Sequence, residues 1–323
     1  MVRTIPTPYS SRFVVRRSVQ TVLQALLVVA LLAACGGSGA DTGEAAGLEV
    51  SGKIGTKPKV VIAKDSEAGN KLESEVLTTG KGPKVKKGDL LVADYLGKNY
   101  RSGKVFDNSY DRGAPAAFTL KDGQGGVISG WVKSLAGVPL GSRVLLVAPP
   151  KEAYGKEGNP QAGIKAKDSL VFVVDLSASY NSATELPESS PVTDLPAGLP
   201  SVEGAGEPTV TVPEGTAPPK EPKTTVLATG SGPDVAPGQL GVVQYTAVDW
   251  TGGALSSTWQ DGPQGVPIGG EQPSPFDLLA GIPVGSRVLL ELPAQEGADP
   301  ETKSVAVVID VLGQHGSTKG SAK

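Results

Sequence analysis

One sequence unit occurs twice in this chain, and that duplication limits the folds open to it. The segment AGVPLGSRVLLVAP (136–149) returns 144 positions later as AGIPVGSRVLLELP (280–293). Upstream, GKGPKVKKGD (80–89) matches GSGPDVAPGQ (230–239) at an offset of 150. Since the offset changes between matched segments, the length differences fall in the connections, where loops tolerate them. The 323 residues therefore predict two comparable units.

Each unit is rich in strand signals and carries one helix signal. In the first unit the short alternating or β-branched runs are 71–80, 89–98, 116–123, 142–149 and 169–176. Glycine, proline and aspartate bound these runs, as is typical of β-strands. Val127, Trp131 and Leu135 recur every four residues and predict one short helix closed by Gly137. Several strands and one helix predict an α+β fold with the helix on one sheet face.

The N-terminus has the pattern of an export signal. The apolar run from Val19 to Ala34 is preceded by four arginines, Arg3, Arg12, Arg16 and Arg17. No acidic residue occurs before Asp41, and a basic head followed by an apolar run is typical of an export signal. The run ends at Cys35, the only cysteine of the chain, in a context that resembles the lipobox of bacterial lipoproteins. That resemblance implies removal of residues 1–34, acylation of Cys35 and anchoring on the outer face of the cell membrane. The alternative is a cysteine without a role.

Composition excludes several classes of function. Without the four signal arginines, 26 basic and 33 acidic side chains remain, a net charge near −7 that argues against a nucleic-acid partner. A single cysteine permits no disulfide within the chain. His315, the only histidine, lies in a predicted polar tail, and there is no Cys/His cluster, so a structural zinc site is not expected.

Segments rich in small and polar residues set the expected domain boundaries. We expect a signal peptide at 1–34, a flexible tether at 35–46 and a first domain at 47–179. A Ser/Pro-rich linker is expected at 180–197, followed by a second domain at 198–313 and a disordered tail at 314–323. Each unit is long enough to bury its own core.

The first unit resembles the FKBP-type peptidyl-prolyl isomerases. The segments VADYLG, GKVFDNSYDRGAPAAFTL, GGVISGW, LGSRVLLVAP, AYGKEGNP and SLVFVVDL follow one another at the spacing of that family. The resemblance implies a bent antiparallel sheet wrapped around a short helix, with an apolar pocket between them. It also implies catalysis of cis/trans isomerisation at X-Pro bonds without a cofactor.

The resemblance also assigns the site residues. The implied catalytic set is Tyr95, Phe106, Asp107, Trp131, Tyr154 and Phe172, and the implied substrate-binding set is Val127, Ile128, Arg112 and Phe118. Trp131 would form the pocket floor, while the Ile128 N–H and the Tyr154 hydroxyl would hold substrate carbonyls. Two positions depart from the family pattern: Ala116 stands where an aromatic residue is common, and Asn159 replaces a frequent histidine.

Two further segments suggest other sites without meeting their spacing. LKDGQGGVISG (120–130) is a glycine-rich loop between a strand and a helix, but it lacks the G-x-G-x-x-G spacing of a dinucleotide site. DNSYDRG (107–113) offers acidic and amide oxygens without the spacing of a calcium loop.

The second unit keeps the apolar pattern but loses most of the aromatic residues. Phe106 is matched by Leu255, Asp107 by Ser256, Trp131 by Phe276 and Phe172 by Val307. We therefore expect a folded but catalytically weak or inactive FKBP-like domain. Trp250 and Trp259 would favour binding of a partner if they are exposed to solvent, and the alternative is that they pack at the edge of the domain.

The expected partners are proline-containing exported polypeptides and the membrane, through a lipidated Cys35, with the family's macrolide inhibitors as further ligands. The rival interpretation is a non-catalytic peptide-binding or chaperone lipoprotein. A structural surface lipoprotein is a third alternative, which would not need Trp131 and Tyr154 in one register.

Overall fold

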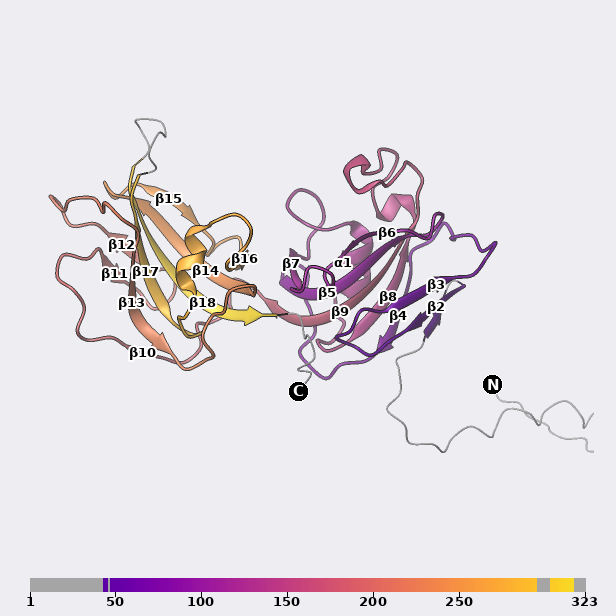
Figure 1. Cartoon of the computed structure of the whole chain (residues 1–323), viewed down its shortest axis with the longest axis horizontal. Helices are drawn as coiled ribbons and strands as arrows, with labels where there is room; N and C mark the ends of the chain where they lie inside the picture. Colours follow the sequence, from indigo (N-terminus) through magenta and orange to yellow (C-terminus); the bar gives the residue numbers. More distant parts are fainter. Residues whose placement is uncertain (1–42, 46, 295–302, 317–323) are drawn as a thin grey trace, which may run out of the picture. The chain divides into compact units, whose positions relative to one another are not determined.

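The computed structural model describes residues 43–45, 47–294 and 303–316 (Figure 1). The expected signal peptide and Cys35 lie outside the described residues. Within these ranges the chain forms antiparallel sheets and one α-helix, so the predicted α+β class is confirmed. No helix of the described residues is both long and apolar enough to cross a bilayer.

The first large sheet has the strand order β4-β8-β9-β5-β6, and β7 pairs with the other part of β5. Its strands are β4 (Glu73–Thr78), β5 (Leu90–Asn99), β6 (Val105–Asn108), β7 (Ala116–Thr119), β8 (Arg143–Ala148) and β9 (Leu170–Tyr180). All of these pairings are antiparallel. The predicted strands are thus present, and β6 is an additional one.

Both faces of this sheet are buried. Side chains alternate between the two faces along each strand, and the side chains of each face pack into a cluster of their own. Along β8, Val144 and Leu146 pack into one core with Trp131. Leu145 and Val147 point to the opposite face and belong to a second cluster. A single strand therefore contributes to two separate cores.

The predicted short helix is confirmed as α1 (Ser129–Leu135), which contributes Trp131, Val132 and Leu135 to the first core. It ends before Gly137, whose φ of 86° lies in the left-handed region that favours glycine. Helix α1 lies against this sheet (Figure 1) and packs on it through the first core.

A small sheet made of β1 (Gly43–Ala45), β2 (Leu48–Ser51) and β3 (Lys59–Ile62) covers the second face. Leu48, Val50 and Val60 are each at most 7% exposed and pack in the cluster that contains Leu145 and Val147. The expectation of a flexible tether up to residue 46 is therefore wrong at its end, because β1 pairs with β2.

A buried ion pair ties this small sheet to the large one. Arg143, fully buried, donates to Asp175 over 2.6 and 2.7 Å. It also donates to the carbonyls of Gly52 and Thr56, each over 2.8 Å, and the Gly55 N–H donates to Asp175. A buried charge needs its hydrogen-bonding capacity satisfied, and two of the four hydrogen bonds that Arg143 donates go to carbonyls of the β2–β3 hairpin.

The second large sheet repeats this plan with the order β10-β13-β17-β18-β14-β15, and β16 pairs with β14. Its strands are β10 (Ser189–Pro191), β13 (Lys223–Gly230), β14 (Leu240–Asp249), β15 (Ala254–Ser257), β16 (Gln264–Pro267), β17 (Arg287–Leu292) and β18 (Val305–His315). A hairpin of β11 (Ser201–Glu203) and β12 (Thr209–Thr211) accompanies it.

The ion pair is repeated as well. Arg287 donates to Asp310 over 2.7 and 2.8 Å and to the carbonyls of Gly204, Ala205 and Gly206 in the β11–β12 hairpin.

Several sequence expectations for this region need correction. The expected linker contains β10, which pairs with β13, and the expected tail begins too early, because β18 runs to His315. Burial lowers the pKa of this histidine. Trp250 is not exposed: it packs beside Val248 and Leu289, and its indole N–H donates to the Thr216 carbonyl.

The second sheet also lacks the α-helix that the sequence predicts. In its place stands the 3₁₀ helix η3 (Pro275–Leu279). Pro275 starts it, and Ser274 and Asp277 form a capping box that satisfies its first N–H groups. Five residues close only a short turn, so Phe276 is presented from a tighter element than Trp131.

Candidate active site

The first unit contains a cavity of about 520 Å³ between α1 and the sheet. Six of the side chains that line it are aromatic, and they come from widely separated parts of the chain. They are Tyr95 on β5, Phe106 on β6, Phe118 on β7, Trp131 on α1, Tyr154 and Phe172 on β9. Val127 and Ile128 also line it, so every predicted site residue inside the described ranges except Arg112 is a lining residue.

Trp131 lies at the centre of the aromatic group. Its ring makes edge-on contacts with Tyr95, Phe118 and Phe172, with centroid distances of 5.6, 5.0 and 5.5 Å. Such edge-to-face pairs are favourable beyond the area they bury. Trp131 is 3% exposed, and its indole N–H has no partner among the described residues. The floor of the cavity is therefore a closely packed aromatic surface, and the indole N–H beneath it is buried.

The residues before the helix supply a backbone donor. Ile128 has extended φ and ψ angles and precedes the first turn, and its carbonyl accepts the N–H of Trp131 over 3.0 Å. Its own N–H has no partner within the described part of the chain. Because Ile128 lines the cavity, this amide is available to an acceptor on a ligand.

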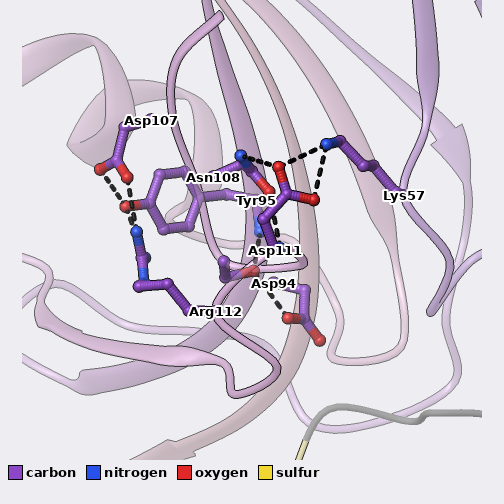
Figure 2. A network of polar contacts seen from close by, with 8 residues as sticks. Lys57, Asp94, Tyr95, Asp107, Asn108, Asp111 and Arg112 are labelled. Atoms are coloured by element: carbon purple, nitrogen blue, oxygen red, sulfur yellow. Dashed lines mark hydrogen bonds and ion pairs between the residues drawn. The ribbon is translucent and has the colours of Figure 1, made fainter. Parts of the chain in front are cut away.

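A polar group of three residues forms one side of the cavity. The Tyr95 hydroxyl donates to the Asp107 carboxylate, and Arg112 donates to Asp107 over 2.5 Å and to the Tyr95 oxygen over 3.0 Å. Figure 2 shows the tyrosine hydroxyl between the carboxylate and the guanidinium. Burial, followed by the Asp107 carboxylate, raises the pKa of Tyr95 to about 12. Arg112 thus acts on the cavity through Tyr95 and Asp107.

Tyr154 lies at the rim rather than in the interior, with 37% of its surface exposed. It follows the 3₁₀ helix η1 (Pro150–Glu152). The loop after it continues to η2 (Pro160–Ala162), which Asn159 caps by accepting the N–H of Ala162. The Tyr154 hydroxyl has no partner among the described residues, so it is free to donate to a ligand.

Sequence reasoning missed part of the lining. Asp122, Gly123, Gly126, Ser129 and Ala153 also face the cavity. Four of these belong to the glycine-rich segment 120–130, whose sequence suggested only a nucleotide site. A Cβ atom on Gly126 would lie 1.9 Å from the Lys121 carbonyl oxygen, so the loop can adopt this conformation beside the cavity only with glycine at position 126. Ala116 packs against the core and is not a lining residue.

The corresponding region of the second unit has fewer aromatic contacts and a different packing of the matching residues. Tyr245 and Phe276 form its only aromatic contact among the described residues, at 6.0 Å and tilted. Leu255 is 54% exposed, whereas Phe106 at the matching position packs edge-on against Phe172. Val307 is buried in the core.

Comparison with known proteins bears on the first unit. The family of FKBP-type peptidyl-prolyl cis-trans isomerases matches residues 82–177. A probable FK506-binding protein of Corynebacterium glutamicum is 32% identical over 122 residues, which cover 37% of this chain and 96% of that protein. This chain belongs to the FKBP family.

Other FKBP relatives are matched over a smaller share of their length. FkpA of Escherichia coli (strain K12) is 44% identical over 102 residues, 32% of this chain and 35% of that protein. The chain thus spans about a third of the length of this curated relative. The crystal structure of FkpA matches with 42% identity and a TM-score of 0.30, covering 33% of this chain and 47% of that one.

Proposed function

We propose that this FKBP accelerates cis/trans isomerisation of X-Pro bonds in exported polypeptides through the aromatic cavity of its first unit. The single observation that supports this most is the joint lining of one cavity by Trp131, Tyr154 and the unpartnered Ile128 amide. The proline ring would lie over Trp131, while the Ile128 N–H and the Tyr154 hydroxyl would donate to the carbonyls on either side.

The reaction suits a cavity without a nucleophile. Rotation about an X-Pro bond has to break amide resonance, against a barrier of about 18–20 kcal/mol. The twisted amide has lost its charge separation, so an apolar cavity favours it over the planar ground state. A million-fold acceleration requires only about 8 kcal/mol of such differential stabilisation. Tyr95, Asp107 and Arg112 satisfy one another and would orient the polar edge of the substrate.

We further propose two FKBP-like domains, at 47–179 and 198–313, of which the second is degenerate. The repeated strand order, the repeated ion pair and the loss of the aromatic lining support this assignment. Residues 1–34 would direct export, and an acylated Cys35 would anchor the protein to the outer face of the membrane. Replacing Cys35 by alanine should then abolish labelling by palmitate in a bacterial host and release the protein from membranes.

The activity is tested on residues 36–323 with a proline tetrapeptide in a protease-coupled isomerisation assay. The unmodified chain should accelerate isomerisation, and Trp131→Ala and Tyr154→Ala should each reduce kcat/KM by tenfold or more, since about 1.4 kcal/mol is a factor of ten. Phe276→Ala is the matched control in the second unit and should leave kcat/KM unchanged. A folded chain without acceleration, but with measurable affinity for the peptide, would instead indicate a peptide-binding lipoprotein.

Several relatives carry the name FK506-binding protein, and we propose that macrolides such as FK506 compete with the substrate for the cavity of the first unit. Competition should be lost together with catalysis in Trp131→Ala.

A further inference from the structure

The loop between β6 and β7 connects the cavity to the far face of the sheet. Within it, Arg112 donates to Asp107 and Tyr95 at the cavity. Two residues earlier, the Tyr110 hydroxyl donates over 2.9 Å to Asp175. Asp175 is the carboxylate that Arg143 and the Gly55 N–H hold against the β2–β3 hairpin. One short loop therefore bonds to the cavity on one side and to the anchor of the hairpin on the other.

A second link joins the same hairpin to the same loop. Lys57, just before β3, contacts both oxygens of Asp111 over 2.7 Å. The side chains of Asn108 and Asp111 close the loop on itself, since the Asp111 N–H donates to Asn108 and the Asn108 amide donates to Asp111. Figure 2 shows Lys57 reaching Asp111 of this loop on one side of the Tyr95 ring, and Arg112 of the same loop reaching Asp107 and the Tyr95 hydroxyl on the other.

The second unit keeps the anchor of the hairpin but lacks the counterparts of Lys57 and Tyr110. Its hairpin is held by Arg287 and Asp310 in the same manner. At the position of Lys57 it has Glu207, which accepts from the neutral Ser257 over 2.8 Å. At the position of Tyr110 it has Trp259, whose indole N–H has no partner among the described residues. The ion pair that anchors the hairpin is thus common to both units. The contacts of Lys57 and Tyr110 are found, among the described residues, only in the first unit, where the loop also carries Arg112 beside the aromatic cavity.

We propose that the β2–β3 hairpin, which precedes the segment matched by the FKBP family, is a positioning element of the active site. Tyr110 and Lys57 are positioning residues: they hold the 108–113 loop so that Arg112 keeps Tyr95 and Asp107 in place at the cavity. This inference rests on the proposed isomerase function for its kinetic effect. Its structural effect on Arg112 is independent of that function.

Tyr110→Phe in residues 36–323 tests the buried link, because it removes the hydroxyl and keeps the ring. Tyr100→Phe is the matched control. Tyr100 also reaches the N-terminal segment, through Ser66 over 3.2 Å, but it lies outside the 108–113 loop. We expect kcat/KM to fall about three- to tenfold in Tyr110→Phe and to stay within twofold in Tyr100→Phe. The expected loss is smaller than the roughly tenfold or more that a hydrogen bond to a charged group can contribute, because Tyr110 acts on the cavity only through Arg112.

Lys57→Met tests the exposed link, with Lys59→Met, an exposed lysine of β3, as its control. We expect a loss of about two- to threefold at low salt, because exposed pairs contribute little. The difference between Lys57→Met and the unmodified chain should shrink as salt screens the pair. The double variant Lys57→Asp/Asp111→Lys should recover most of the loss, which a purely structural role of Lys57 would not produce.

NMR resonances of the Arg112 guanidinium provide a readout that does not need catalysis. They should shift or broaden in Tyr110→Phe and remain unchanged in Tyr100→Phe. Equal behaviour of the two tyrosine variants, in these resonances and in kcat/KM, would overturn the inference and leave the hairpin as a stabilising cover. An inactive unmodified chain would refute the isomerase function alone, and the Arg112 resonances would then decide the inference.

Discussion

The two large sheets of this chain share their strand order and their buried ion pair but differ in what covers the inner face. In the first, an α-helix places Trp131 among five aromatic residues around a cavity. In the second, a 3₁₀ turn places Phe276 beside Tyr245. The comparison teaches that the anchoring of the hairpin and the aromatic lining are separate properties of one repeated plan. Substitutions can therefore change one of the two without the other.

The largest expected effect concerns what the units share. Arg143→Ala and Arg287→Ala should each lower the free energy of unfolding of their own unit by about 3–5 kcal/mol, because each leaves a buried aspartate without its cation. Differential scanning calorimetry of the chain would resolve the affected transition. Arg101→Ala is the control, since Arg101 is 60% exposed in its pair with Asp168 and should cost about 1 kcal/mol or less. If Arg143→Ala costs no more than this control, the anchor is not a shared source of stability.

The next effect concerns what the units do not share. Giving the first unit the residues of the second, as Phe106→Leu, Asp107→Ser, Trp131→Phe and Phe172→Val together, should lower kcat/KM at least about a hundredfold, or about 2.7 kcal/mol. The physical reason is that the cavity loses two aromatic walls, the wide indole floor and the Asp107 carboxylate, while the core stays apolar. The protease-coupled assay measures it, and Phe276→Leu serves as the control. Retention of activity within threefold would show that the aromatic lining does not explain the difference.

A smaller effect comes from buried polar groups. Gln244 is 1% exposed, and neither polar atom of its side chain has a partner among the described residues. Its counterpart Asp94 accepts from Ser109 over 2.7 Å. Gln244→Met should raise the free energy of unfolding by about 1 kcal/mol, whereas Ser109→Ala should lower it by about 1 kcal/mol. Urea denaturation of both variants checks the opposite signs, and a destabilising Gln244→Met would contradict this account.

The smallest effect is expected from pH. No histidine lines the cavity, and Tyr95, with its pKa raised to about 12, stays protonated. Because its folded pKa exceeds its unfolded value near 10, its contribution to stability is complete below pH 10 and is lost as the pH rises toward 12. Between pH 6 and 9, kcat/KM should vary less than twofold. A bell-shaped profile in that range would indicate acid–base catalysis and contradict the proposed mechanism.

Much of the site could be predicted because local pattern and family spacing act together. Val127, Trp131 and Leu135 gave the helix from their period alone, and the strands around 90–98 and 143–148 followed from alternation. The contact between Tyr110 and Asp175 could not be predicted, because 65 residues separate them and only the folded sheet brings them together.

The small sheet at 43–62 was missed for a related reason. Its strands are three or four residues long, and they are stabilised by a partner surface that no local pattern reveals. The second helix was predicted wrongly, because Pro275 and the short run after it limit the element to a single tight turn.

The small sheet of β1, β2 and β3 and the Arg143–Asp175 ion pair have a practical consequence for moving the FKBP domain into another protein. A fragment cut at residue 82, where the family match begins, would leave Leu145 and Val147 facing water and Arg143 without the Gly52 and Thr56 carbonyls. Such an exposed apolar face invites aggregation. The smallest transplantable piece therefore starts near Leu48, and its borders follow the buried charge rather than the similarity to relatives.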